Sequence, residues 1–211
     1  MSNDFLMDRF AATSAEPVHL GLSEATVTRL HRGTEVLFHK EGPGVDDEAD
    51  RLAWLGSTGF PCPQLLDRGV NWMLTSELPG RDASQPWPAA QRPAVLRAIA
   101  DGLRQLHTLT DCPFISPFPG DPQVLTHGDY CAPNVFIDPE TLRFTGVLDL
   151  SHLGLGDPYV DIALMMNSLS NNLNPQYGGP PAARLFAKTY GANPDDPRVK
   201  YFIDWTATGS G

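Results

Sequence analysis

The pattern of apolar positions in the first eighty residues changes from alternation to helical spacing and back again. Five short runs predict strands: 18–20, 25–30, 35–40, 64–67 and 72–77. A turn at His31–Thr34 predicts an antiparallel hairpin between the second and third runs, and a turn at Asp67–Gly69 separates the last two. Between the third and fourth runs, Val45–Leu55 has helical spacing, an acidic first turn and Gly56 as its expected end. A polar leader runs to about Ser14.

The rest of the chain is mainly helical in its spacing. A proline-rich connection through Pro88 is followed by four segments that predict helices: 95–106, 159–170, 182–190 and 197–206. Two short strands are expected near 135–137 and 145–150. We therefore predict an α+β architecture with a small β-rich N-terminal lobe, a linker and a larger helical C-terminal lobe. Their expected bounds are 1–77, 78–80 and 81–211.

The net charge limits the kinds of molecule that the protein is expected to bind. The 15 basic and 25 acidic side chains give a formal net charge of −10, which argues against a surface that binds nucleic acid or an anionic membrane. The same charge attracts a cationic small molecule. Hydrophobic residues at 41% are typical of a globular protein and exclude wholesale disorder.

Cysteine usage and hydropathy predict a cytoplasmic protein. Cys62, Cys112 and Cys131 are odd in number and scattered, which excludes a disulfide framework and a Cys-x-x-Cys zinc site. No apolar run reaches the roughly 20 residues of a membrane span, and no basic-then-apolar signal region is expected at the N-terminus. These features predict no oligomeric state.

The strongest chemical signal is the loop His127–Asn134, followed by Asp149 at the end of a predicted strand. It combines two carboxylates with a neutral amide oxygen, a set suited to magnesium-dependent phosphoryl transfer. Asn134 and Asp149 would hold Mg²⁺, and Asp129 would orient a substrate hydroxyl and accept its proton. Any one of these side chains alone is as readily explained by turn formation, so the argument depends on their combination.

The N-terminal lobe offers a group to bind phosphates. Lys40 ends an apolar strand, and Glu48 lies eight residues later in the predicted helix. The two would form an ion pair that directs the lysine at the phosphates of a nucleotide. The alternative is two solvated surface charges.

The loop and the distal aspartate also match a known family. From about Gly21 to Phe202 the chain resembles aminoglycoside phosphotransferases of the kanamycin-kinase type, within the protein-kinase-like superfamily. The resemblance implies a two-lobed protein-kinase-like fold, with Asp129 as catalytic base and with Asn134 and Asp149 as magnesium ligands. It implies ATP or GTP as phosphate donor, Mg²⁺ as cofactor and a small-molecule hydroxyl as acceptor.

Further roles follow from the same resemblance. Ser23 and nearby backbone N–H groups would cover the nucleotide phosphates, next to the lysine–glutamate pair. Ser76 and Leu78 would lie on the hinge whose backbone pairs with the adenine edge. Phe38 would stack on adenine, with a place in the apolar core as the equally favoured alternative.

Three residues near the loop are expected to be structural. Asp157 and Asp161 lie in the segment 154–163, where the resemblance implies that they brace the loop through hydrogen bonds. His127 is interpreted as a buried hydrogen-bonding strut rather than a general base. Cys131 needs no redox role.

The chain departs from the family where the acceptor would bind. The family inserts a pair of acidic helices before the catalytic loop, whereas this chain has only 110–123, in which four prolines make a helical hairpin unfavourable. The C-terminal segment Asp204–Trp205 is out of register with the acidic and aromatic tail of the family. Four aromatic residues are candidates for an acceptor-binding surface, although apolar packing is the expected fate of any one of them: Trp87, Phe114, Phe118 and Trp205.

These observations leave three hypotheses. The first is an ATP-dependent kinase of a small-molecule hydroxyl, with a cationic aminoglycoside as the favoured acceptor and antibiotic resistance as the role. The second is a kinase of another amino-alcohol or sugar. The third is a pseudokinase that binds nucleotide without transferring phosphate.

Overall fold

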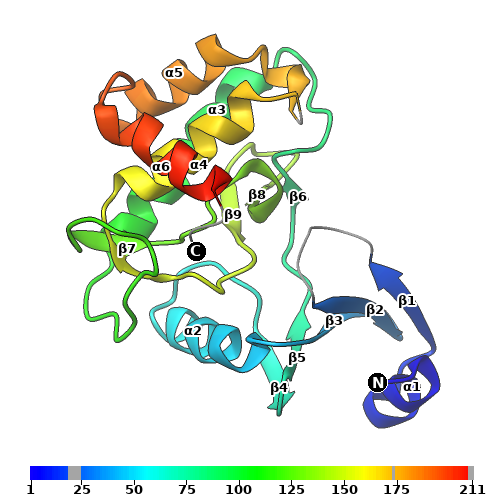
Figure 1. The fold of residues 1–211 in the computed structure, drawn as a ribbon. Coiled ribbons are helices and arrows are strands. Elements are labelled where there is room, and N and C mark those ends of the chain that lie inside the picture. Colours follow the sequence, from blue (N-terminus) through cyan, green and yellow to red (C-terminus); the bar gives the residue numbers. More distant parts are fainter. Residues whose placement is uncertain (19–24, 173, 209–211) are drawn as a thin grey trace. The chain divides into compact units, whose positions relative to one another are not determined.

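The computed structural model describes residues 1–18, 25–172 and 174–208 of the chain. It divides the chain into two compact units, Met1–Leu78 and Pro79–Gly211, which are described separately (Figure 1). Among the described residues, no helix combines the length and hydropathy required to cross a bilayer.

The first unit is built on an antiparallel sheet. In its described residues, five strands pair in the order β1-β2-β3-β5-β4: β1 (Ser14–Val18), β2 (Thr26–Arg32), β3 (Glu35–Glu41), β4 (Leu65–Gly69) and β5 (Trp72–Ser76). The predicted β2–β3 hairpin is confirmed, with Leu30 opposite Leu37. The second turn lies later than expected: Gly69 still pairs with Trp72, and Asn71 takes the left-handed conformation at φ 58°. Of the expected strand 18–20, residues 19 and 20 lie outside the described ranges.

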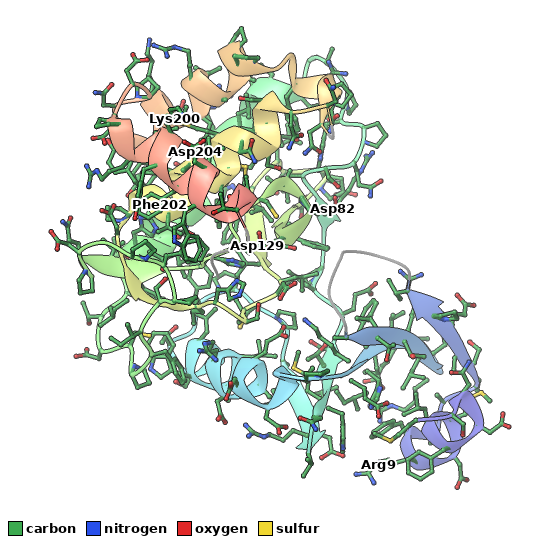
Figure 2. The ribbon with its side chains drawn as sticks, viewed as in Figure 1. Arg9, Asp82, Asp129, Lys200, Phe202 and Asp204 are labelled. Carbon is green, nitrogen blue, oxygen red and sulfur yellow. The ribbon has the colours of Figure 1, made fainter. Side chains whose placement is uncertain are left out.

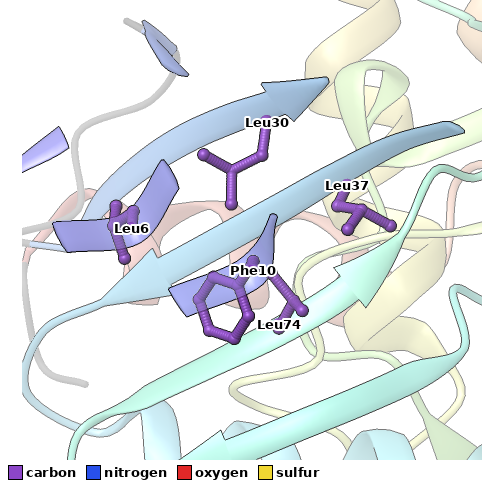
Figure 3. Close-up of a cluster of buried hydrophobic side chains, with 5 residues drawn as sticks. All are labelled: Leu6, Phe10, Leu30, Leu37 and Leu74. Carbon is purple, nitrogen blue, oxygen red and sulfur yellow. The ribbon is translucent and has the colours of Figure 1, made fainter. Parts of the chain in front are cut away.

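A short helix replaces part of the expected polar leader. α1 (Asn3–Phe10) begins after Ser2, whose hydroxyl accepts a hydrogen bond from the backbone N–H of Phe5. Its apolar residues, four positions apart, pack with three leucines of the sheet, as Figure 3 shows. The cluster consists of Leu6, Phe10, Leu30, Leu37 and Leu74. This helix was not predicted because most residues of the segment are polar. Two buried side chains on one face, Leu6 and Phe10, are enough to dock it on the sheet.

The helix α2 (Val45–Ser57) follows β3, as predicted, and extends one residue beyond Gly56. It packs against β4 and β5. Side chains alternate along β3, so Leu37 points toward α1 while Phe38 and Lys40 share the opposite face of the sheet.

In the described part of the second unit, four long helices dominate, and all four were expected. They are α3 (Arg92–His107), α4 (Tyr159–Ser170), α5 (Pro180–Tyr190) and α6 (Pro197–Ala207). α4 packs against α5 and α6, and α3 packs against α5. α4 is buried over most of its surface, which suits a central helix.

Two small sheets, counted over the described residues of the second unit, position the candidate catalytic residues. One pairs β6 (Arg81–Asp82), β8 (Val135–Ile137) and β9 (Phe144–Val147); the other pairs β7 (Val124–Thr126) with β10 (Gly154–Gly156). Strands β6, β7 and β10, of two or three residues each, were not predicted, although β8, which is equally short, was. The loop 127–134 connects β7 to β8, and Asp149 lies between β9 and β10.

Candidate active site

The loop between β7 and β8 carries Asp129 on a tightly packed turn (Figure 2). Gly128, just before it, has φ +81°, and a Cβ at this position would lie 2.4 Å from the Cβ of His152. A side chain is therefore excluded at Gly128 both by conformation and by space. The packing fixes where the chain presents Asp129.

Asn134 lies beside Asp129, as the spacing of five residues suggested. Its amide nitrogen donates to the Asp129 carboxylate, 2.8 Å from Oδ2, and to the Asp129 backbone carbonyl at 3.0 Å. A single turn of 3-10 helix, Ala132–Asn134, brings the two side chains together. Because the amide nitrogen of Asn134 donates to Asp129, the amide oxygen is the atom of this side chain that could accept a metal ion.

The environment of Asp129 raises the pKa of its carboxyl. Burial is the main cause, and the negative charge of Asp149 adds to it. Interaction with His127 and hydrogen bonds from Cys131 and Asn134 oppose the shift. The carboxylate is thus a stronger proton acceptor than an exposed aspartate, which suits a general base. Burial also raises the pKa of the Cys131 thiol, so this cysteine is not a thiolate nucleophile at neutral pH.

Asp149 follows β9 in an unusual backbone conformation, with φ +60°. The hydroxyl of Ser151 donates to its carboxylate at 3.2 Å. The backbone N–H of Leu148 donates to the carbonyl of Asn134 at 2.9 Å and ties the two segments together. Positive φ at a non-glycine residue is uncommon and occurs often at functional sites.

The donor set fits magnesium. Among the described residues, no group of three His, Cys, Asp or Glu side chains could hold a metal ion. Mg²⁺ needs only one or two protein oxygens when phosphate oxygens and water supply the rest, and Asn134 and Asp149 provide such oxygens.

A buried carboxylate braces the loop from α4. Asp161 is fully buried and accepts hydrogen bonds from the backbone N–H groups of His127, at 2.8 Å, and Gly128, at 2.9 Å. Its Oδ2 also lies 3.0 Å from Nε2 of His107, at the end of α3. Nδ1 of His107 lies 2.8 Å from the Tyr190 hydroxyl on α5. Side chains of α3 and α5 thus support, through Asp161 of α4, the backbone of the loop 127–134.

The sequence indicated Asp161 as a brace but missed His107 and Tyr190. The available signal was a histidine at the end of an apolar helix face. That pattern does not identify Asp161, 54 positions away, as the residue that the histidine contacts.

His127 is the strut that was expected. It is fully buried, and its Nε2 lies 2.9 Å from the carbonyl of Leu148. Its Nδ1 accepts from the backbone N–H of Asp129 at 3.2 Å. Both ring nitrogens are therefore engaged by backbone groups. Asp157, which was also expected to brace the loop, instead accepts from the Tyr159 N–H at 2.9 Å and lies 3.3 Å from Arg198.

In the first unit, Lys40 and Glu48 form the anticipated ion pair. Nζ of Lys40 lies 2.6 Å from Oε2 of Glu48, and the side chains are 16% and 6% exposed. Such burial excludes the alternative of two solvated surface charges. The β3–α2 connection is short enough to set this pair locally.

The remaining predicted nucleotide residues occupy varied positions. Phe38 is half-buried on the face of Lys40, and its ring centroid lies 5.5 Å from the Arg29 guanidinium carbon. Ser76 uses its backbone N–H and hydroxyl to pair with Gln64, and Leu78 is buried. Ser23 lies outside the described residues. The nucleotide contacts of these residues stay predictions.

Comparison with known proteins decides the family. The model of the phosphotransferase enzyme family matches residues 14–119 and 115–202, most of the chain. The chain belongs to the phosphotransferase enzyme family. A member from Streptomyces fradiae, an aminoglycoside 3'-phosphotransferase, is 34% identical, with 92% of this chain and 94% of the relative covered. This membership confirms the recognition made from the sequence.

Solved structures of the family confirm the protein-kinase-like two-lobed fold. The crystal structure of an aminoglycoside-3'-phosphotransferase of type VIII matches with TM-score 0.80 and 28% identity, over 94% of this chain and 95% of the other. A phosphotransferase from Streptomyces rimosus, solved with ADP and streptomycin, matches with TM-score 0.75 and 26% identity, over 95% of each chain.

This member of the family is shorter than its relative. The match to the Streptomyces fradiae enzyme extends over 252 positions, more than the 211 residues of this chain. The relative therefore has additional residues within the matched span. The two matches of the family model meet at 115–119, inside the segment that was expected to lack the acceptor-side helices.

Proposed function

We propose that this protein is an antibiotic-resistance-type kinase that transfers the γ-phosphoryl group of ATP to a hydroxyl of an aminoglycoside. The observation that carries the proposal is the cluster of Asp129, Asn134 and Asp149 on a braced loop. Membership of the phosphotransferase family and the aminoglycoside phosphotransferases among its relatives support the same reaction. The observations favour neither the pseudokinase nor another acceptor class.

Asp129 acts on the acceptor. Its carboxylate orients the attacking hydroxyl and accepts the proton, helped by the raised pKa that burial produces. Asn134 holds Asp129 in place through its amide nitrogen and directs its oxygen, with Asp149, to Mg²⁺. The metal, when bound, neutralises charge on the transferring phosphoryl group.

Residues of the first unit bind the nucleotide in this proposal. Lys40, fixed by Glu48, binds the phosphates, and Ser23 covers them. Phe38 stacks on the base, and the backbone around Ser76 and Leu78 pairs with its edge. The ADP complex of the Streptomyces rimosus relative supports a nucleotide donor, and in this proposal the donor is ATP rather than GTP.

The acceptor is a cationic small molecule. The net charge of −10 favours it, and the Streptomyces rimosus relative was solved with streptomycin. A cytoplasmic location is part of the proposal, because the donor is ATP and the three cysteines are unpaired.

The substitution Asp129→Asn tests the proposal. It keeps the shape of the side chain and removes the proton acceptor, so transfer from ATP to kanamycin should fall by about 10²- to 10⁴-fold while ATP binding persists. Coupled assays with Mg²⁺ measure the transfer, and calorimetry measures the binding. Asp195→Asn is the matched control, since Asp195 is exposed and paired with Arg184.

Two outcomes would count against the proposal. Full transfer by Asp129→Asn would remove the role of Asp129. Absence of transfer by the unmodified protein to every member of a panel that includes kanamycin and neomycin would contradict the aminoglycoside assignment and favour another acceptor or the pseudokinase.

A further inference from the structure

The segment 110–123 is short and irregular, but it is firmly attached to β10. The N–H of Leu155 donates to the carbonyl of Phe114 at 2.9 Å, and the N–H of Ser116 donates to the carbonyl of Leu155 at 3.0 Å. Further along, the N–H of Gln123 donates to the carbonyl of Gly156 at 2.9 Å. The segment is therefore held by backbone hydrogen bonds at residues 114–116 and at Gln123.

Two glycines of β10 permit this close approach. A Cβ at Gly154 would lie 2.4 Å from the carbonyl carbon of Ile115, and a Cβ at Gly156 would lie 2.9 Å from the Cβ of Ser116. Side chains at these positions would push the segment away. The segment is a built part of the second unit, and its side chains are placed in advance of any ligand.

Between these two attachment points, the ring of Phe118 lies close to the rings of Trp205 and His152. The ring centroid of Phe118 lies 4.7 Å from that of Trp205 on α6, at an interplanar angle of 46°. It also lies 6.0 Å from that of His152, which it meets edge-on at 84°. Phe118 and Trp205 are half-buried and His152 is exposed, so none of the three residues is fully enclosed by the protein. We call these three residues the aromatic cluster.

The aromatic cluster begins beside the catalytic loop. His152 lies three residues after Asp149, and its Cβ and backbone contact Gly128, the residue before Asp129. From there the cluster passes through Phe118 to Trp205. A ligand lying on these rings would thus have one end next to the proposed catalytic base.

Carboxylates around α6 are engaged by cations of the chain itself. Asp204 pairs with Lys200 on the same helix (Figure 2). Arg198 lies 3.3 Å from Asp157 and 3.0 Å from Asp196. The faces of aromatic rings attract cations as well, and a sugar ring packs on them through its apolar face.

We propose that Phe118 and Trp205 form the acceptor-binding platform of this enzyme and that His152 connects it to the catalytic loop. The ligand is an amino-substituted sugar or cyclitol ring, whose ammonium group lies over a ring face. This inference rests on the proposed function and specifies how the same site binds its acceptor. The segment 110–123, where the two matches of the family model overlap, contributes the ring of Phe118 to this surface.

The test removes each ring face while keeping apolar volume, with the variants Phe118→Leu and Trp205→Leu. Isothermal titration with kanamycin should show affinity reduced by about 5- to 20-fold in each. In the transfer assay, the KM for kanamycin should rise by the same factor, with the KM for ATP and kcat within about twofold. Trp205→Phe, which keeps a ring, should retain most of the affinity.

Tyr201→Leu is the matched control. Tyr201 is an exposed aromatic residue of the same helix whose ring meets that of Phe202, outside the aromatic cluster. Its replacement should leave kanamycin affinity unchanged. Thermal melts of all variants separate loss of binding from loss of fold.

Three results would overturn the inference, and a fourth would leave it standing. Unchanged kanamycin affinity in both leucine variants, or Trp205→Phe as weak as Trp205→Leu, would overturn it, as would absence of binding by the unmodified protein. Binding that depends on the two rings but is followed by no transfer would leave the platform standing and contradict the kinase assignment instead.

Discussion

His107 shows at the residue scale how one buried side chain supports the loop 127–134 through a second residue, Asp161. Its ring is 4% exposed and links Asp161 on α4, at 3.0 Å, to Tyr190 on α5, at 2.8 Å. Asp161 in turn holds two backbone N–H groups of the loop. A buried carboxylate that loses one of its partners costs about 1–3 kcal/mol, so His107 is a positioning residue with an effect on stability as well.

We expect His107→Ala to lower kcat by roughly tenfold, with the KM values for ATP and acceptor nearly unchanged, because the loop loses its support rather than its ligands. His107→Gln should restore part of the rate, since its amide N–H can donate to Asp161. Steady-state kinetics of both variants decide the matter. If glutamine is as slow as alanine while the melting temperature recovers, the positioning role is wrong.

At the element scale, α1 covers an unusual residue of β3. His39 is buried beneath α1, stacked on Trp72 with ring centroids 5.5 Å apart and near Phe10 at 6.2 Å. Among the described residues, Nε2 of His39 has no hydrogen-bond partner. Burial lowers the pKa of His39, and the N-terminus and Arg9 add to this effect while Glu41 opposes it.

Acid should therefore loosen the first unit. The folded state keeps His39 neutral, whereas the unfolded chain takes up the proton near the ordinary pKa of 6.5. Stability is complete above this pH and falls as pH drops below 6.5, by at most about 1.4 kcal/mol per pH unit for one proton. Urea unfolding from pH 8 to 5 measures the slope. His39→Leu should flatten it, and parallel curves for the two proteins would contradict this account.

Also at the element scale, the short strands of the second unit determine where the loop 127–134 and Asp149 lie. Strands of two to four residues, β6 to β10, are weak alone, yet they bring the loop 127–134 and Asp149 together. They are stable because α3 packs against β7, β8 and β9, and α4 packs against the 3-10 turn Ala132–Asn134 that ends the loop. The precision of the site thus comes from the helical core of the second unit.

At the scale of the whole molecule, net charge is the property with a functional consequence. A chain of −10 attracts a polycationic acceptor over a distance that salt screens, with a Debye length of about 10 Å at 0.1 M. We expect the KM for kanamycin to rise several-fold between about 0.02 and 0.3 M NaCl. Assays at constant Mg²⁺, with sucrose as the uncharged control, measure this. A KM that does not change with salt would show that long-range charge has no part in acceptor binding.

The sequence was most informative where the determining contacts are local. Helical periodicity predicted α2 to α6, because one face of each helix must be apolar. The five-residue spacing placed Asn134 beside Asp129, and the short β3–α2 connection placed Glu48 beside Lys40. The roles of these residues in catalysis stay predictions that the proposed variants test.

Contacts between residues far apart in the sequence could be identified only from the tertiary structure. Trp87, a candidate for the acceptor surface, is 1% exposed and donates to the carbonyl of Asp82, whereas Phe118 and Trp205 meet from positions 87 residues apart. The bridge from Tyr190 through His107 to Asp161 likewise depends on how three helices pack. Periodicity records which face of an element is buried, but not which other element covers it. That choice is made by packing of the whole unit, and with it the residues available to hold the loop and bind the acceptor.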